Sequence, residues 1–167
     1  MSRTSAKRSV AKLFDSPEQE AYLQLWRTYD RLREIEEQLF GQYRLTAQQY
    51  NALRVLQSLK GEPMPTSSLG SRLVSRAPDM TRMLDKLEER KLVARQRNKD
   101  NRRVVEVSIT TAGTALLKKL AADVRTCSRE QLGHMSPTAL RQMVKLLKEA
   151  RLPHEAKHVE DAWPGNE

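Results

Sequence analysis

Basic side chains are concentrated in one short part of this chain, and their spacing suits contacts to nucleic acid. Residues 60–103 contain twelve Lys or Arg and six Asp or Glu, so about a quarter of the chain carries +6 of the formal net charge of +9. Clustered cations attract a polyanion, and Arg can pair with guanine in the major groove of duplex DNA. A solvated basic surface is the alternative. The distribution predicts a polyanion as the partner, and the helices and hairpin that carry these cations make double-stranded DNA the expected one.

One group of candidate DNA contacts lies on a helix that is expected to carry Pro78 in its first turn, with Met83, Leu84 and Leu87 facing inward. Side chains near a helix start can reach base edges, and those further along lie nearer the phosphates. Asp79 either accepts from a cytosine amine or orients an Arg. A solvated helix face is the alternative. The candidate base contacts are Arg76, Ala77, Asp79 and Met80, and the candidate phosphate contacts are Arg82 and Lys86.

A second group lies on an expected β-hairpin. Residues 92–97 read as one strand, Asn98–Asn101 has turn composition, and the alternation from Val104 to Ile109 predicts the other strand. Cations this dense repel one another in a free hairpin, so an anionic partner is expected. The cations of this hairpin are Arg95, Arg97, Lys99, Arg102 and Arg103. We expect Arg102 or Arg103 to enter the minor groove, where the negative potential is high.

Capping patterns and apolar periodicity predict the helices that position these groups. Gly61 and Pro63 end the second helix, and a turn at Val74-Ser75 separates the third from the fourth. Helices are expected from Ser16 to about Gly41, from Thr46 to about Leu59, from a cap at Thr66 through Leu69 and Leu73, from about Pro78 through Leu87, from Thr110 or Thr111 onward, and from Ser136-Pro137 onward.

This order predicts a mainly α fold (α+β). A winged helix-turn-helix is expected over residues 46–110, with a helical dimerisation platform from residues 16–45 and 111–150. Residues 1–15 are expected to form a flexible basic arm and residues 151–167 a polar tail. The apolar stripes of the end helices exceed what the middle domain can cover, which predicts a homodimer. An intramolecular helical subdomain is the alternative.

The block from Leu69 to Gly113 resembles the multiple antibiotic resistance regulator (MarR) family of bacterial transcription factors, and the resemblance extends over about residues 20–150. It implies a homodimeric winged helix-turn-helix regulator on a palindromic operator, most often a repressor, and often release by a small-molecule ligand. The matching positions are Leu69-x3-Leu73, Thr81-Arg82-x4-Leu87-Glu88, Leu92-Val93, Arg103 with the strand Val104–Ile109, and Thr110-x2-Gly113.

Two positions depart from the family pattern. Lys91 stands where Gly is usual before the Leu-Val of the first hairpin strand, so that turn needs another way to relax. Asn101 stands where Asp usually precedes the hairpin Arg by two residues. It can accept a hydrogen bond but cannot form the ion pair that aims the hairpin.

Aromatic side chains suggest where a ligand would bind. In the family, small aromatic or phenolic molecules often occupy a cleft between the helical platform and the DNA-binding lobe. Core packing is the alternative for each aromatic residue. The candidate ligand contacts are Trp26, Tyr29, Arg33 and Tyr50, with Tyr43 nearby.

Several other functions are disfavoured. The single cysteine, Cys127, reads as a packed small hydrophobe in a protein of a reducing compartment, the cytoplasm. No apolar run approaches a membrane span, and His134, His154 and His158 lack the spacing of a metal site. No cofactor motif or catalytic nucleophile is present, and 167 residues leave no room for an additional catalytic domain. A winged-helix protein-interaction module with secondary DNA binding is the remaining alternative.

Overall fold

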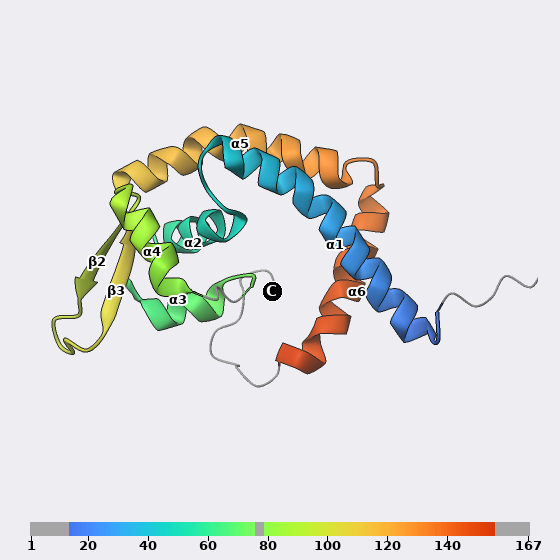
Figure 1. The fold of residues 1–167 in the computed structure, drawn as a ribbon, viewed down its shortest axis with the longest axis horizontal. Coiled ribbons are helices and arrows are strands. Elements are labelled where there is room, and N and C mark those ends of the chain that lie inside the picture. Colours follow the sequence, from blue (N-terminus) through green and yellow to red (C-terminus); the bar gives the residue numbers. More distant parts are fainter. Residues whose placement is uncertain (1–13, 76–78, 156–167) are drawn as a thin grey trace, which may run out of the picture. The chain divides into compact units, whose positions relative to one another are not determined.

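The computed structural model describes residues 14–75 and 79–155. The chain divides into two compact units, residues 1–34 and 35–167, with the boundary inside the first helix. The mainly helical order with one small sheet confirms the predicted fold class (Figure 1). The elements are α1 (Pro17–Gln42), α2 (Ala47–Ser58), β1 (Met64–Pro65), α3 (Thr66–Arg72), α4 (Met80–Glu89), β2 (Val93–Arg97), β3 (Val105–Ile109), α5 (Thr111–Leu132) and α6 (Pro137–Glu155).

Three predicted helix starts are confirmed by their caps. Thr46 Oγ1 accepts from the N–H of Gln49 (3.2 Å), and the Gln49 side chain accepts from the N–H of Thr46 (3.0 Å), which completes a capping box. Thr110 Oγ1 accepts from the N–H of Gly113 (3.1 Å) at the start of α5. Ser136 Oγ does the same for the N–H three residues further on (3.2 Å), ahead of α6. Each cap satisfies an N–H that the helix leaves unpaired.

Two helix starts differ from the prediction. Thr66 is the first residue of α3 and not its cap, because β1 pairs with β3 through Pro65 and leaves Pro65 at the N-cap. The helix α4 begins at Met80 with Asp79 as its cap, later than expected. The predicted place of Pro78 lies outside the described residues.

The end of the chain also differs from the prediction. The helix α6 continues through Pro153 to Glu155, where a polar tail was expected from residue 151. An ion pair on its last turn joins Arg151 Nε to Glu155 Oε1 (2.6 Å). Pro153 cannot donate a backbone hydrogen bond, and the helix ends two residues after it.

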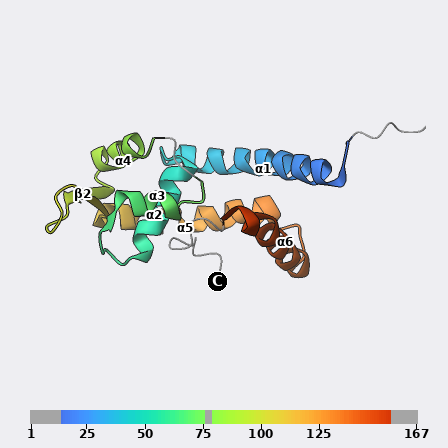
Figure 2. The same ribbon diagram turned by 90° about the horizontal axis from the view of Figure 1, so that it is seen from below.

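The sheet attaches the hairpin to the core of the second unit. Its strand order is β1-β3-β2, all antiparallel, with Arg95 opposite Val107 and Arg97 opposite Val105. Val107 is fully buried, so the sheet face that carries it packs on the core. That core also contains side chains of α1, α2, α3, α4 and α5: Phe40, Leu53, Leu56, Leu69, Leu84, Leu87 and Leu120. The hairpin and α4 lie at the same end of this unit in both views (Figures 1 and 2).

Candidate nucleic-acid interface

The helix α4 has one buried face and one basic face. Met83, Leu84 and Leu87 are buried, as predicted. Arg82 and Lys86, four residues apart, are exposed. Residues four apart on a helix lie on the same side, so the two cations form one exposed stripe. Their assignment to phosphate remains a prediction.

The residues expected at base edges lie in different environments. Arg76 and Ala77 are outside the described residues. The Asp79 carboxylate accepts from the N–H of Arg82 (2.9 Å) and so caps the start of α4. Met80 is half-buried and packs against the core, so most of its side chain faces inward. Contacts of these four residues with bases stay predictions.

Arg95 on β2 ties the hairpin to α4. Its guanidinium donates to Asp85 (2.6 Å) and to Glu88 (2.5 Å from Nη2, 2.9 Å from Nε), and its backbone N–H also donates to Glu88 (3.2 Å). These bonds, led by the side-chain hydrogen bond from Arg95, lower the pKa of Glu88, and the bond to Glu88 raises the pKa of Arg95. Two carboxylates therefore compensate the Arg95 charge. Its predicted contact with DNA is untested.

The tip of the hairpin is ordered by two asparagine side chains. Asn98 Oδ1 accepts from the N–H groups of Asp100 (2.9 Å) and Asn101 (2.8 Å). Asn101 Oδ1 accepts from the N–H of Arg103 (3.1 Å). The expectation that Asn101 still accepts a hydrogen bond is confirmed. These bonds hold the loop in one conformation without using the charged groups beside it.

The remaining hairpin cations point into solvent. They are Arg97, Lys99, Arg102 and Arg103, and all four are exposed. The Arg97 side chain donates from Nη1 to the backbone carbonyl of Arg102 (3.1 Å). Exposed cations on an ordered loop suit recognition of phosphates or of a narrow minor groove, because the loop is already fixed before binding.

The turn from α4 into β2 forms although residue 91 is lysine, where the family usually has glycine. Lys91 adopts a left-handed conformation, with φ of 57°. Its N–H donates to the carbonyl of Glu88 (2.7 Å), and the N–H of Leu92 donates to that of Leu87 (2.9 Å). This is the hydrogen-bond pattern of a Schellman helix end, which usually carries glycine at the left-handed residue. The lysine keeps the same turn, at the cost of a strained backbone.

Two residues that connect the helices of the second unit were not predicted from the sequence. Asn51 Oδ1 on α2 accepts from the N–H of Val74 (2.9 Å), which fixes the turn between α3 and α4. Arg90, at the end of α4, donates to the backbone carbonyls of Tyr43 (3.1 Å) and Arg44 (2.6 Å). Both partners lie more than twenty residues away, so no local pattern points to them.

The candidate ligand residues divide between the two units. Trp26, Tyr29 and Arg33 belong to the first unit, where Trp26 is 61 % exposed and Tyr29 is 59 % exposed. Tyr50 belongs to the second unit, where its half-buried ring stacks on Phe40 with ring centroids 4.6 Å apart. This stacking is a core contact of the kind weighed as the alternative. The ligand site remains a prediction.

Residues 14–75 and 79–155 hold neither a candidate metal site nor a candidate membrane span. No group of three or more His, Cys, Asp or Glu side chains is gathered there as a metal site would need. No helix in the same residues has both the length and the apolar character to cross a bilayer.

Comparisons with known proteins match this fold and sequence to one family of transcription factors. The model of the MarR family matches residues 45–105. A crystal structure of a MarR transcription factor from Planctomyces limnophilus is 52 % identical and has a TM-score of 0.65, with 81 % of this chain and 98 % of that chain covered.

Two further relatives are more distant. The organic hydroperoxide resistance transcriptional regulator of Bacillus subtilis (strain 168) is 32 % identical over 99 residues, and the match spans 58 % of this chain but only 65 % of that protein. BpsR of Bordetella bronchiseptica, whose DNA binding is regulated by 6-hydroxynicotinic acid, is 24 % identical. Its TM-score is 0.72, with 82 % of this chain and 96 % of that chain covered, and at this identity it shows the fold alone.

Proposed function

Because this chain belongs to the MarR family of transcriptional regulators, we propose that it binds double-stranded DNA sequence-specifically and represses transcription from the bound site in the cytoplasm. The observation that carries the proposal is the exposed basic surface of α4 and the hairpin, on which Arg82, Lys86, Lys99, Arg102 and Arg103 face solvent. Arg95 and the Asn98 turn support it, because they fix the hairpin against α4 before any DNA is bound.

Two arginines should fail in different ways when replaced by alanine. Arg103→Ala should weaken binding to all sequences if the side chain meets phosphate, or reduce a preference for A·T-rich flanks if it enters the minor groove. Arg76→Ala should cost about 1–3 kcal/mol on the cognate site and relax sequence preference, as loss of a base contact does. Each variant is titrated against the cognate duplex and a scrambled one, with fluorescence anisotropy as the readout.

Arg125→Ala is the matched control for this pair. Arg125 is an exposed cation on α5, so its loss lowers the net charge equally without touching α4 or the hairpin. If Arg103→Ala and Arg76→Ala both bind like this control while remaining folded, the surface is not the DNA interface. Retained binding of a protein partner would then favour the protein-interaction module.

We also propose that the protein acts as a homodimer on an inverted repeat. Large apolar side chains stand exposed on one protomer, on α1 (Leu25, Trp26, Tyr29) and on α6 (Val144, Leu146, Leu152). Covering them with a second copy removes apolar surface from water, and obligate interfaces of this kind commonly exceed about 2,000 Å². Light scattering at micromolar concentration should therefore report twice the 19.2 kDa chain mass. Half-sites should lie about 34–36 Å apart, one turn of DNA. A stable, folded monomer would contradict this assembly.

Release of DNA by a small aromatic acid is the last part of the proposal. It is supported by the exposed Trp26 and Tyr29 rings, by the cationic Arg33 and by the aromatic acid that regulates BpsR. A ligand of this class should quench Trp26 fluorescence and weaken operator binding together, by about 1–3 kcal/mol of coupling. The measurement uses a Trp163→Phe background, since the chain has two tryptophans. A broad panel of aromatic acids that gives neither quenching nor release would exclude this kind of effector.

A further inference from the structure

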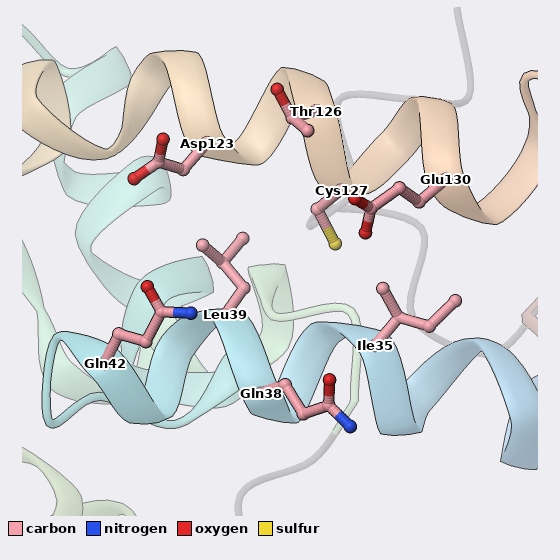
Figure 3. A pocket seen from close by; sticks show the side chains of 8 residues that line it. All are labelled: Ile35, Gln38, Leu39, Gln42, Asp123, Thr126, Cys127 and Glu130. Atoms are coloured by element: carbon pink, nitrogen blue, oxygen red, sulfur yellow. The ribbon is translucent and has the colours of Figure 1, made fainter.

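A cavity of about 260 Å³ lies between the C-terminal half of α1 and the middle of α5, within the second unit (Figure 3). From α1, Ile35 and Leu39 supply apolar surface and Gln42 supplies an amide. From α5, Asp123 and Glu130 supply carboxylates about two helical turns apart, with Cys127 between them. The cavity therefore combines a short apolar wall with a wall that carries two acids.

The charge of this cavity is opposite to that of the protein. None of its lining residues is basic, although the chain carries a formal net charge of +9. The Cys127 side chain extends toward α1 in Figure 3, and the residue is only 7 % exposed. Its thiol is free, in no disulfide. Burial raises the pKa of this thiol, and the charges of Glu36 and Glu130 raise it further. The surroundings thus disfavour an anion and favour a cation.

We propose that this cavity binds a small organic cation, a primary amine with a short apolar body. The ammonium group has three donors, which suit the carboxylate oxygens of Asp123 and the amide oxygen of Gln42 at one end of the cavity, while Glu130 adds negative charge at the other end. The apolar body would lie against Ile35, Leu39 and Cys127, which are the non-polar part of the lining. An aromatic acid would meet two like charges here, so this site differs in chemistry from the one proposed around Trp26.

A chain of hydrogen bonds joins this cavity to α4. The Tyr43 hydroxyl donates to Asp123, and Lys119 Nζ lies 5.8 Å from the centre of the Tyr43 ring. The backbone carbonyls of Tyr43 and Arg44 accept from Arg90 at the end of α4. An ammonium group that engages Asp123 neutralises its charge and so weakens the hydrogen bond that this carboxylate accepts from the Tyr43 hydroxyl. Occupancy of the cavity would therefore loosen the connection that positions α4, a step that rests on the proposed function.

Binding to the cavity can be measured without DNA. Cys127 is the only cysteine in the chain, so any alkylation of the protein at cysteine reports on this cavity. The rate of its alkylation by iodoacetamide, followed by intact mass, reports access to the cavity. Benzylamine, phenethylamine and cyclohexylamine serve as probes, with benzyl alcohol and benzoate as neutral and anionic controls. At least one amine should slow alkylation about tenfold at saturation, whereas benzyl alcohol and benzoate should not. A thermal unfolding curve for each sample shows that the rate reports occupancy and not stability.

Shape-conserving variants locate the site. Asp123→Asn keeps the shape and removes the charge, and it should weaken amine protection of Cys127 about ten- to a hundredfold, as loss of a charged hydrogen bond does. Glu149→Gln is the matched control, since Glu149 is an exposed acid on α6 that does not line the cavity. The site is disproved if no amine protects Cys127, if benzyl alcohol or benzoate protects equally, or if Asp123→Asn behaves like Glu149→Gln.

Tyr43→Phe tests the connection to α4. This variant frees Asp123, so it should bind the amine several-fold more tightly and bind duplex DNA more weakly even without amine. DNA titrations with and without amine are run at matched ionic strength, because salt alone weakens DNA binding. Failure of the unliganded wild type to bind DNA would contradict the proposed function and leave the cavity result intact. If amines protect Cys127 but leave the affinity for DNA unchanged, the connection between the cavity and α4 is contradicted and the amine site itself is retained.

Discussion

Raising the salt concentration from 50 mM to 200 mM should lower the affinity of this protein for its operator by about 10³–10⁵, if the dimer makes about 6–10 phosphate contacts. Duplex DNA holds a layer of condensed counterions, and each cation that meets a phosphate releases some of them. Added salt reduces the entropy gained by that release. The exposed hairpin cations, together with Arg82 and Lys86, provide enough charge on two protomers for contacts of this number.

Single variants make this test specific to the surface. Arg102→Ala should reduce the slope of log affinity against log salt by about one unit for each protomer whose side chain meets phosphate. Lys145→Ala is the control, because Lys145 is an exposed cation on α6 and its loss changes net charge alone. The titration uses a fluorescent duplex at several salt concentrations. A flat salt response, or equal slopes for the two variants, would place phosphate contacts elsewhere on the protein.

Much of the fold follows from local sequence patterns. The capping residues Thr46, Thr110 and Ser136 act within three residues of themselves, so their effect on helix starts can be read without knowing the tertiary structure. The alternation from Val104 to Ile109 likewise predicted a strand, and β3 forms there with Val107 buried. The charged hairpin was predicted for the same reason, since turn composition and strand period are local properties.

The environment of single charged residues could not be predicted in the same way. Arg95 was counted as a hairpin cation, yet it lies on the same strand face as the buried Val93, and that face turns toward α4. The two-residue period of the strand places Arg95 on the face of Val93, but the partners of Arg95, Asp85 and Glu88, belong to α4 and cannot be read from the strand. Asp79 was expected to accept from a cytosine amine or to orient an Arg, and its role as the cap of α4 was missed because the helix begins later than predicted, at Met80.

The contacts of Arg90 are even harder to predict from the sequence than those of Arg95. Its partners are the backbone carbonyls of Tyr43 and Arg44, and every residue type has a backbone carbonyl. The composition of α1 therefore contains no sign of the contact. It forms because the left-handed residue Arg44 turns the chain at the end of α1 and presents these carbonyls to α4.

Gly113→Ala should destabilise the protein by about 3 kcal/mol, at the upper end of the usual cost of overpacking. Alanine in a helix is normally better than glycine by up to about 1 kcal/mol, so the expected sign is reversed. A Cβ atom at Gly113 would lie 2.3 Å from the carbonyl oxygen of Leu92 and 2.8 Å from Ile109 Cγ1. The Leu92 oxygen cannot retreat freely, because it accepts from the N–H of Thr110 (3.1 Å) and from its hydroxyl (3.1 Å). The close approach of α5 to the start of β2 therefore requires glycine.

Gly41→Ala is the matched control for this prediction. Gly41 also lies in a helix, α1, but a Cβ atom there would meet nothing within 4 Å. This variant should stabilise the protein by up to about 1 kcal/mol, because only the helix preference changes. Urea unfolding at one fixed protein concentration compares the two, since a dimer's stability depends on concentration. Opposite signs would show that contact with the Leu92 carbonyl, and not glycine's flexibility, sets the requirement at Gly113. If Gly113→Ala were as stable as Gly41→Ala, α5 and the hairpin would have to be packed further apart than the structure has them.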